Sequence, residues 1–336
     1  MGTTYHVTVV SRLEPRGIRS RLEARLGQLE RTFSTYVEDS ELNRFSRLDR
    51  VGEPFPASAD LLRVMKVASR VHVLSGGAWD ATVRPLVDLW GFGPAPPARE
   101  PPAAGAIAAL LGRVGFGSIE VRPDSLVKGR AGVRLDLSSI AKGYGVDAVA
   151  ELVRGQGFRD FLVEIGGEVR GAGTRADGRP WRVGIGQPRP DAAPDEIYRV
   201  VPLGDAALAT SGDYRIFFES GGVRYSHVLD PRTGRPVANG VVSVTVLAPD
   251  CTLADGLATA VMVMGKDAGL ALLERLPDVE GLVVVGTADG RLDDHPTAGF
   301  RSDLNHILES ANPGTHPDGG LISCGVQSRS VGTPKR

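Results

Sequence analysis

The chain has 336 residues, of which 42% are hydrophobic and 24% charged, a composition typical of globular proteins with a substantial core. Its formal net charge of −1 gives no electrostatic reason to expect nucleic acid or a membrane surface as a partner. Only two cysteines are present, which excludes a disulfide framework and a cysteine-based metal centre, and no apolar run is long enough to span a bilayer.

The first half of the chain alternates strand patterns with amphipathic helices. Apolar residues at helical intervals, with Arg and Glu between them, predict the helices. A run dominated by Pro and Ala predicts a surface loop. In chain order we expect a strand at Tyr5–Val10, a helix at Ile18–Phe33, a short helix capped by Asp39 or Ser40, a helix at Ala59–Leu74 that ends at Gly76-Gly77, a loop at Ala95–Ala106, and a turn and a strand within Leu110–Leu126.

The stretch Val133–Leu152 predicts a strand that runs directly into a helix. Apolar and polar residues alternate over Val133–Leu137, and apolar residues then recur at helical spacing. Ser138 or Ser139 stands at the expected cap position. The free amides of such a helix start, with Lys142 one turn in, suit a phosphate. The alternative is an ordinary strand-to-helix turn without a ligand.

The second half is predicted to consist mainly of strands separated by glycine-rich turns. The paired glycines within Phe161–Gly173 indicate a close approach by a ligand or another backbone. We expect residues 1–300 to form one two-lobed domain, and residues 301–336, which are polar and rich in Gly, Ser and Pro, to form a disordered tail. Strands are expected at Phe161–Gly173, Trp181–Gly186, Leu208–Phe218, Val223–Leu229, Val241–Leu247 and Gly281–Gly286, a tight turn at Asp230–Pro236, and helices at Cys251–Gly265 and Ala268–Leu276.

Asp255 and Thr259 are the most informative polar pair. They stand four residues apart on the predicted Cys251–Gly265 helix and therefore share a face. A carboxylate beside a hydroxyl offers oxygen ligands that suit Mg²⁺, which keeps positions open for phosphate. The structural alternative places Asp255 near a helix start and packs Thr259 inward.

His227 is the histidine whose surroundings best suit a general base. It stands at the end of a predicted strand, directly before the Asp230–Pro236 turn. An imidazole titrates near neutral pH, as a base for a hydroxyl should. The alternative is a histidine that is hydrogen-bonded at a strand end. Asp230 either orients the ring or only sets the turn.

Three further side chains have both a structural and a functional interpretation. Asp136 accepts a hydrogen bond from a base ring or ribose, or caps a strand end. Lys142 neutralises phosphate, or is a solvated side chain. Tyr36 contacts a ligand by stacking or hydrogen bonding, or is a packed loop aromatic. The residue pattern alone does not decide between these alternatives.

Nine motifs follow one another between Met1 and about Phe300: MGTTY, STYVEDSELNRFS, GGAWDATVRPLVDLWGFGP, LDLSSIAKGYGVD, VEIGGEV, WRVGIGQP, ATSGDYR, YSHVLDPRTGRPV and CTLADGLATA. Together they resemble the ApbE-like family of FAD:protein FMN transferases. No one motif decides the matter, whereas so many in the same order are highly specific.

The resemblance implies a single α+β, T-fold-related domain with a mainly antiparallel sheet and flanking helices. It also implies a Mg²⁺-dependent enzyme that moves FMN from FAD onto a Ser or Thr hydroxyl of an acceptor flavoprotein and releases AMP. By motif, His227 is the implied base, and Asp255, Thr259 and an oxygen of Ser139, its backbone carbonyl, are the implied metal ligands. The implied FAD site comprises Met1 at its edge, Tyr36, Ala78, Trp79, Asp80, Asp136, Lys142 and Leu229.

Two other functions would use the same residues. With water in place of the protein hydroxyl, the enzyme would be a Mg²⁺-dependent FAD pyrophosphatase that gives FMN and AMP. A non-catalytic FAD-binding protein would leave FAD intact, and it would not require Asp255, Thr259 and His227. The family commonly carries an export signal, whereas this sequence begins at the first motif. We therefore expect a cytoplasmic protein, or a periplasmic or membrane-anchored one if a leader is missing from the sequence.

Overall fold

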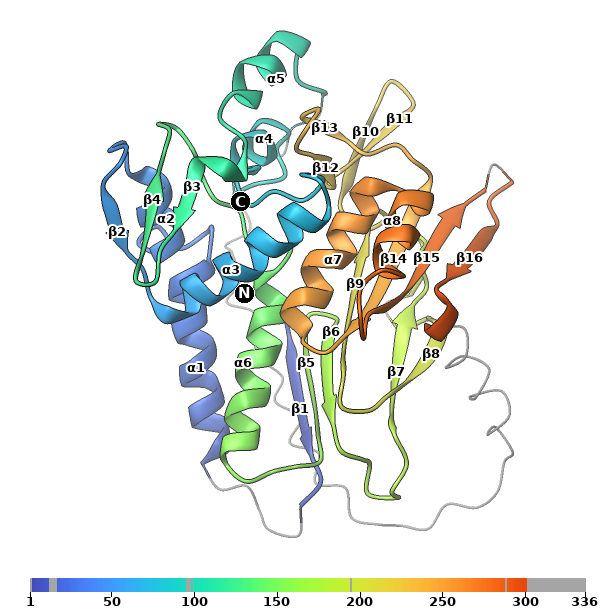
Figure 1. The fold of residues 1–336 in the computed structure, drawn as a ribbon. Coiled ribbons are helices and arrows are strands. Elements are labelled where there is room, and N and C mark those ends of the chain that lie inside the picture. Colours follow the sequence, from blue (N-terminus) through green and yellow to red (C-terminus); the bar gives the residue numbers. More distant parts are fainter. Residues whose placement is uncertain are drawn as a thin grey trace, which may run out of the picture.

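A seven-stranded sheet runs through the centre of the computed structural model, which describes residues 2–11, 17–94, 98, 100–193, 195–287 and 289–300 (Figure 1). Every strand pair in these ranges is antiparallel. The predicted fold class, α+β with a mainly antiparallel sheet and flanking helices, is confirmed. The strand order is β1 (Tyr5–Val9), β5 (Phe161–Ile165), β6 (Glu168–Ala172), β9 (Ala207–Gly212), β14 (Val241–Ala248), β15 (Glu280–Gly286) and β16 (Leu292–Pro296).

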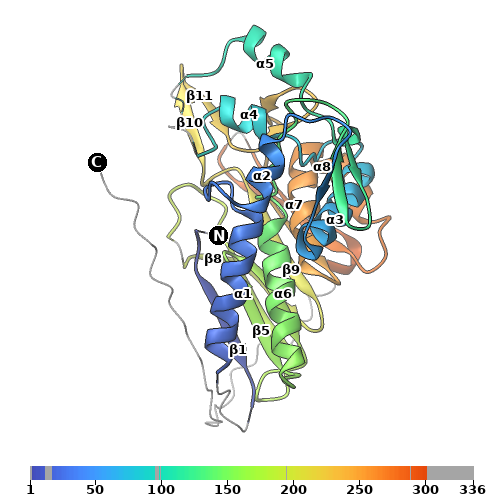
Figure 2. The ribbon, with the colours of Figure 1, turned by 90° about the vertical axis from the view of Figure 1, so that its left-hand side faces the viewer.

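Helices cover one face of this sheet with their apolar stripes. Two of them, α1 (Ile18–Phe33) and α6 (Ala141–Gly155), lie side by side across β1 and β5 (Figure 2). Their buried residues join those strands in one hydrophobic cluster. A third helix, α7 (Cys251–Met264), is buried along nearly its whole length. No helix in the described ranges is both long and apolar enough to cross a lipid bilayer. The other two helices on this side are α8 (Lys266–Leu273) and α3 (Ala59–Leu74), which packs on α7 and α1.

The opposite face of the sheet packs against a two-stranded sheet, β7 (Trp181–Gly186) and β8 (Ile197–Leu203). Alternate residues of a strand point to opposite faces, so each central strand serves both cores. In β6, for example, Val169 joins the cluster under β7 and β8, whereas Ala172 joins the cluster under the helices.

A smaller lobe lies at one end of the central sheet and accounts for the predicted two-lobed shape (Figure 1). Its own small core contains Leu86, Trp90, Ile107 and Leu229. Aromatic rings attach a hairpin to it, with Trp90 5.6 Å from Tyr225 between ring centroids. The elements around this core are α4 (Arg84–Leu89), α5 (Ala104–Leu111), β10 (Phe217–Ser220), β11 (Val223–Ser226), β12 (Leu229–Asp230) and β13 (Arg235–Pro236). The remaining short elements pack on the main core with the helices: α2 (Glu41–Arg47), β2 (Pro54–Pro56), the 3₁₀ turn Phe116–Ser118, β3 (Ile119–Val121) and β4 (Ser125–Lys128).

Several predicted elements are confirmed, and their signals have clear physical causes. The helices α1 and α3 have the predicted bounds, and Ser40 rather than Asp39 caps α2 by accepting from the Asn43 N–H at 3.1 Å. Beyond α3, Gly76 has a positive φ of 58°, which is the left-handed conformation expected just after a helix end. The turn after β12 closes with the Gly234 N–H donating to the Asp230 carbonyl at 2.8 Å.

Other predicted elements are wrong. Residues 133–137 form no strand, and α6 has Ile140 at its N-cap, without a side-chain cap from Ser138 or Ser139. Helix α5 begins inside the predicted Ala95–Ala106 loop, and β8 and β16 were not expected. The predicted Leu208–Phe218 strand is divided between β9 and β10. The predicted tail, residues 301–336, and Met1 lie outside the described residues.

The paired glycines at residues 166 and 167 have a conformational cause. They form the turn between β5 and β6, with φ of 63° and 103°, a region that residues with side chains rarely adopt. The predicted strand Phe161–Gly173 is therefore a hairpin. A ligand is not needed to explain the two glycines.

Candidate active site

The candidate site forms where the first turn of α6 meets α7. Gly143 makes this contact possible, because a Cβ there would lie 2.2 Å from the Cys251 carbonyl oxygen and 2.8 Å from the Asp255 Cβ. The Gly143 N–H donates to Asp255 Oδ2 at 2.9 Å. Asp255 itself is 3% exposed. Asp255, from the last third of the chain, is thus fixed to the central motif that contains Gly143.

The Asp255 contact changes the hydrogen bonding of the helix start. Helix α6 has Ile140 as its N-cap, and the Tyr144 N–H donates to the Ile140 carbonyl at 3.1 Å, so the Gly143 N–H belongs to the first turn, whose amides have no acceptor within the helix. Asp255 accepts that N–H and so caps the helix from a distant part of the chain, whereas Ser139 precedes the N-cap and its carbonyl takes no part in the helical hydrogen bonds. The Ser139 hydroxyl accepts from Trp79 Nε1 at 2.9 Å. No backbone N–H in the described part of the chain donates to the Ser139 carbonyl, so we expect this oxygen of Ser139 to be the one that a ligand uses.

These oxygen atoms fit a hard divalent cation. Thr259 lies one turn after Asp255 on α7, and its hydroxyl is 2.9 Å from the Ser211 hydroxyl on β9. A carboxylate, a hydroxyl and a free carbonyl are the ligand types that Mg²⁺ takes, together with phosphate oxygens and water. Within the described ranges, no group of three or more His, Cys, Asp or Glu side chains is arranged to hold a metal ion. Assignment of Ser139, Asp255 and Thr259 as metal ligands stays a prediction.

A second buried carboxylate fixes the N-terminus of α7. Asp147 on α6 accepts from the Cys251 N–H at 3.0 Å and from the Thr252 N–H at 2.8 Å. It also pairs with Arg170 of β6 at 2.5 Å. Both oxygens of Asp147 therefore have hydrogen-bond donors. Asp147 sets the position of α7, and thereby of Asp255, relative to α6.

Charge at the site is concentrated around Lys142. Its ammonium pairs with the buried Glu168 carboxylate of β6. Burial lowers the pKa of Lys142, but the Asp255 and Glu168 carboxylates outweigh that effect and raise it overall. Burial also raises the pKa of Asp255, which Lys142 and the Gly143 N–H oppose. One ammonium thus faces two buried carboxylates whose pKa values burial raises, and a bound cation would favour the charged form of both.

His227 lies between β11 and β12, with one ring nitrogen fixed. The Ile216 carbonyl accepts from the His227 backbone N–H at 3.0 Å and lies 3.1 Å from Nδ1. With a proton on Nδ1, the Nε2 atom carries the lone pair that accepts a proton. Burial lowers the pKa of His227, and Lys142 lowers it further, whereas the Ile216 carbonyl and Asp136 raise it. The imidazole is therefore neutral over most of the physiological range.

Asp230 does not orient His227. Its carboxylate pairs with Arg232, with Oδ2 2.8 Å from the guanidinium, and also accepts the Arg232 backbone N–H at 2.9 Å. Of the two alternatives for Asp230, the structure supports the turn. Asp136, by contrast, interacts electrostatically with His227, and it also accepts the Ser138 N–H at 2.9 Å.

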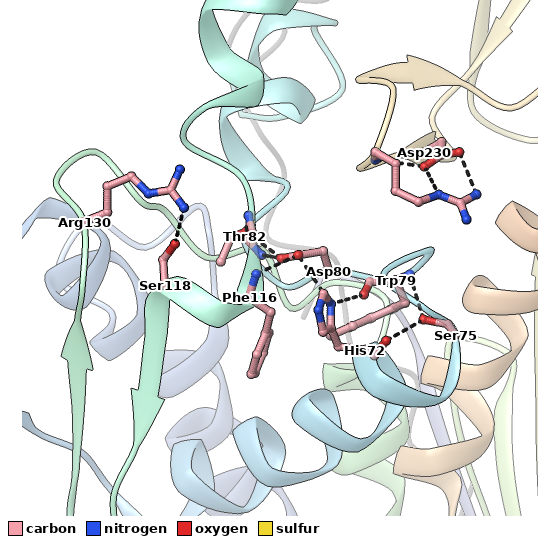
Figure 3. A network of polar contacts seen from close by, with 11 residues as sticks. His72, Ser75, Trp79, Asp80, Thr82, Phe116, Ser118, Arg130 and Asp230 are labelled. Carbon is pink, nitrogen blue, oxygen red and sulfur yellow. Dashed lines mark hydrogen bonds and ion pairs between the residues drawn. The ribbon is translucent and has the colours of Figure 1, made fainter.

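The predicted FAD residues Ala78, Trp79 and Asp80 lie in a buried loop. Figure 3 shows the Asp80 carboxylate at the centre of a network: it accepts the Thr82 N–H at 2.7 Å and the Phe116 N–H at 2.8 Å. His72 lies 3.4 Å from it and also contacts the Trp79 carbonyl at 2.9 Å. This network holds the loop in one conformation, and the contact of the loop with FAD stays a prediction.

Tyr36 and Leu229 lie in different surroundings. Tyr36 is 75% exposed, so its interpretation as a packed loop aromatic is wrong. It lines a cavity of about 230 Å³ together with Arg47, Arg84 and Arg134. Leu229 is buried in the core of the smaller lobe. Met1, the predicted edge of the FAD site, lies outside the described residues.

The structure thus brings together Asp136, Lys142, His227 and Asp255, which come from three distant motifs. It also links Trp79 to Ser139. Tyr36 belongs to a separate cavity, whose described lining includes none of these residues. Residue patterns did not single out Glu168 or Ser211. Glu168 stood within a quoted motif, but the two glutamates of VEIGGEV become distinguishable only once the hairpin register is known.

Gly143→Ala tests whether the close approach of α6 and α7 forms the site. We expect a loss of stability of about 1–3 kcal/mol, because the added methyl group meets backbone that cannot move aside freely. Thermal unfolding measures the loss. Gly155→Ala, at the other end of α6 with no atom within 4 Å of the added Cβ, is the matched control and should not be destabilised. Equal melting temperatures for the two variants would contradict the steric argument.

Comparison with known proteins agrees with this architecture. The family model of the ApbE family matches residues 1–283. A FAD:protein FMN transferase of Vibrio cholerae is 43% identical over 293 residues, covering 86% of each chain, and one of Haemophilus influenzae is 39% identical over 283 residues, covering 82% of each. The solved structure of the flavin transferase ApbE from Vibrio cholerae is similar with a TM-score of 0.82 at 40% identity, covering 90% of this chain and 96% of that one. The chain therefore belongs to the ApbE family.

Proposed function

We propose that this protein is a Mg²⁺-dependent FAD:protein FMN transferase whose catalytic unit is residues 1–300. The observation that carries the proposal is the junction of α6 and α7. There the buried Asp255 accepts the Gly143 N–H, the Ser139 carbonyl accepts no backbone N–H of the described residues, and Lys142 and His227 lie within electrostatic range. The curated relatives named for this activity support it.

In the proposed reaction, the hydroxyl oxygen of an acceptor Ser or Thr attacks the phosphorus of the FMN half of FAD. The bond from that phosphorus to the bridging oxygen breaks, and AMP leaves with the bond's electron pair. The hydroxyl proton passes to His227 Nε2, and the products are the protein–FMN phosphodiester and AMP. A neutral His227 can accept this proton because burial lowers its pKa.

Negative charge builds on the diphosphate oxygens in this step. Lys142 supplies a fixed positive charge in the site. Ser139, Asp255 and Thr259 would hold Mg²⁺, which supplies Lewis acidity and neutralises phosphate charge when bound. Asp136 would accept a hydrogen bond from the bound nucleotide, and Tyr36, whose ring is largely exposed, would contact an aromatic end of FAD.

Incubation with FAD, Mg²⁺ and a candidate acceptor flavoprotein tests the proposal. Transfer predicts flavin fluorescence on the denatured acceptor band and one AMP released for each flavin attached. Free FMN and AMP without labelled acceptor would identify a FAD pyrophosphatase instead. FAD that remains bound and intact would identify a non-catalytic binding protein. An acceptor whose target Ser or Thr is replaced by alanine is the control for specific attachment.

A further inference from the structure

Glu168 has an unusual environment for a glutamate. It is the first residue of β6 and pairs with Ile165 across the turn formed by residues 166 and 167. Its side chain lies under the helices, and the residue is 1% exposed. The other glutamate of the same hairpin, Glu164, has its side chain exposed by 24% and pairs with His6 at 2.7 Å. One hairpin thus holds two glutamates in opposite environments.

One of the two oxygens of the buried Glu168 carboxylate is unpaired in the described part of the chain. One oxygen, Oε1, accepts from the Lys142 ammonium, whereas Oε2 has no hydrogen-bond partner within the described part of the chain. A buried polar atom left unpaired costs free energy, so its retention calls for an explanation. Asp147, which is similarly buried, has donors for both oxygens. Packing alone therefore does not explain Glu168.

The partner of Glu168 explains its position. The Lys142 side chain is 34% exposed, so the ion pair joins a buried strand to a side chain that reaches solvent. A lysine has four rotatable side-chain bonds, and an unrestrained ammonium would spread over many positions. Glu168 restricts it to the region where it interacts with Asp255 and His227. The hairpin turn beside Glu168 is itself held in place, because the Gly166 N–H donates to the Thr4 carbonyl at 3.1 Å.

We propose that Glu168 is a positioning residue, which holds the Lys142 ammonium where negative charge develops as the diphosphate of FAD is cleaved. This inference rests on the proposed function. It predicts that loss of Glu168 affects turnover but does not weaken the affinity for FAD. Without the Glu168 charge, the site becomes more positive and still attracts anionic FAD. Lys142, however, is no longer fixed in the place where it stabilises the transition state.

The experiment compares Glu168→Gln, Lys142→Ala, the double variant and Glu164→Gln. Glutamine keeps the shape of Glu168 and removes its charge. Turnover is measured as AMP released from FAD, so that it reports both transfer and hydrolysis. FAD affinity is measured separately by quenching of flavin fluorescence, with and without Mg²⁺. Thermal unfolding is followed for every variant.

For Glu168→Gln we expect turnover to fall about tenfold, the effect of losing a charge-assisted contact, while FAD binds at least as tightly as to the wild type. In the Lys142→Ala background the same substitution should change turnover less than about twofold, because no ammonium remains to be positioned. Glu164→Gln should match the wild type in both measurements.

Three results would overturn the proposal: wild-type turnover in Glu168→Gln, a tenfold loss that persists without Lys142, or a loss of turnover matched by weaker FAD binding. If Glu168→Gln does not fold, the comparison is made with Glu168→Asp, which keeps the charge but shortens the reach. The same loss of turnover with FAD binding intact is then expected. A wild-type protein that releases AMP but labels no acceptor would contradict the transferase function and leave this comparison valid.

Discussion

Asp255→Ala is expected to abolish FMN transfer, with turnover at least about a thousandfold below the wild type, while FAD binding weakens only partly. The buried Asp255 carboxylate is the only charged side chain among the three proposed metal ligands. A bound cation supplies several kcal/mol of transition-state stabilisation, and each 1.36 kcal/mol corresponds to a factor of ten in rate. FAD retains its contacts with Lys142 and the other side chains. AMP release and flavin fluorescence measure turnover and binding separately.

Asp255→Asn separates loss of charge from loss of structure. An asparagine keeps an oxygen that accepts the Gly143 N–H, so the α6–α7 junction is preserved, whereas the negative charge that attracts a cation is removed. We expect it to lose nearly as much turnover as Asp255→Ala, with a smaller change in melting temperature. Asp267→Asn removes an exposed carboxylate on the neighbouring α8 and should leave turnover unchanged. Normal turnover by Asp255→Asn would refute the assignment of Asp255 as a metal ligand.

The helices α1 and α3 were predictable to the residue because their signals are local. Each presents one apolar stripe to the core, and Ser58 caps α3 by accepting the Leu61 N–H at 3.3 Å. A stripe and a cap need no knowledge of distant residues. Residues 133–137 alternate just as clearly, yet no strand in the described ranges pairs with them. Alternation shows which side chains face inward but not whether a partner strand exists.

The site was predictable as a set of motifs but not as a set of contacts. The cap expected from Ser138 or Ser139 is absent, and Asp255, 112 residues from Gly143, accepts the first-turn N–H that a serine cap would take. Tyr36 and Asp80 stood together in the predicted FAD site. In the structure, Tyr36 is exposed and the Asp80 carboxylate is engaged by the Thr82 and Phe116 N–H groups. Such contacts depend on tertiary packing, which spacing along the chain does not encode.

His227→Ala is expected to lower turnover by at least about a hundredfold, the usual contribution of a general base. Burial lowers the pKa of His227 below the ordinary 6.5, so the neutral form that accepts a proton persists to lower pH than in a free histidine. For the wild type, kcat/KM should therefore rise with pH along a limb below pH 6.5 and then reach a plateau. The variant should lose this limb, because no group at that position titrates.

Asp230→Asn is the matched control for His227, since it alters a carboxylate three residues away that pairs with Arg232. Because Asp230 does not hold the imidazole, this variant should keep the wild-type acid limb and a turnover within about threefold of normal. If Asp230 oriented the ring, both the rate and the limb would change instead. A near-normal rate in His227→Ala would remove His227 from the mechanism. The acceptor hydroxyl would then lose its proton to another group, and Asp136, which interacts with the same site, would be the next residue to replace.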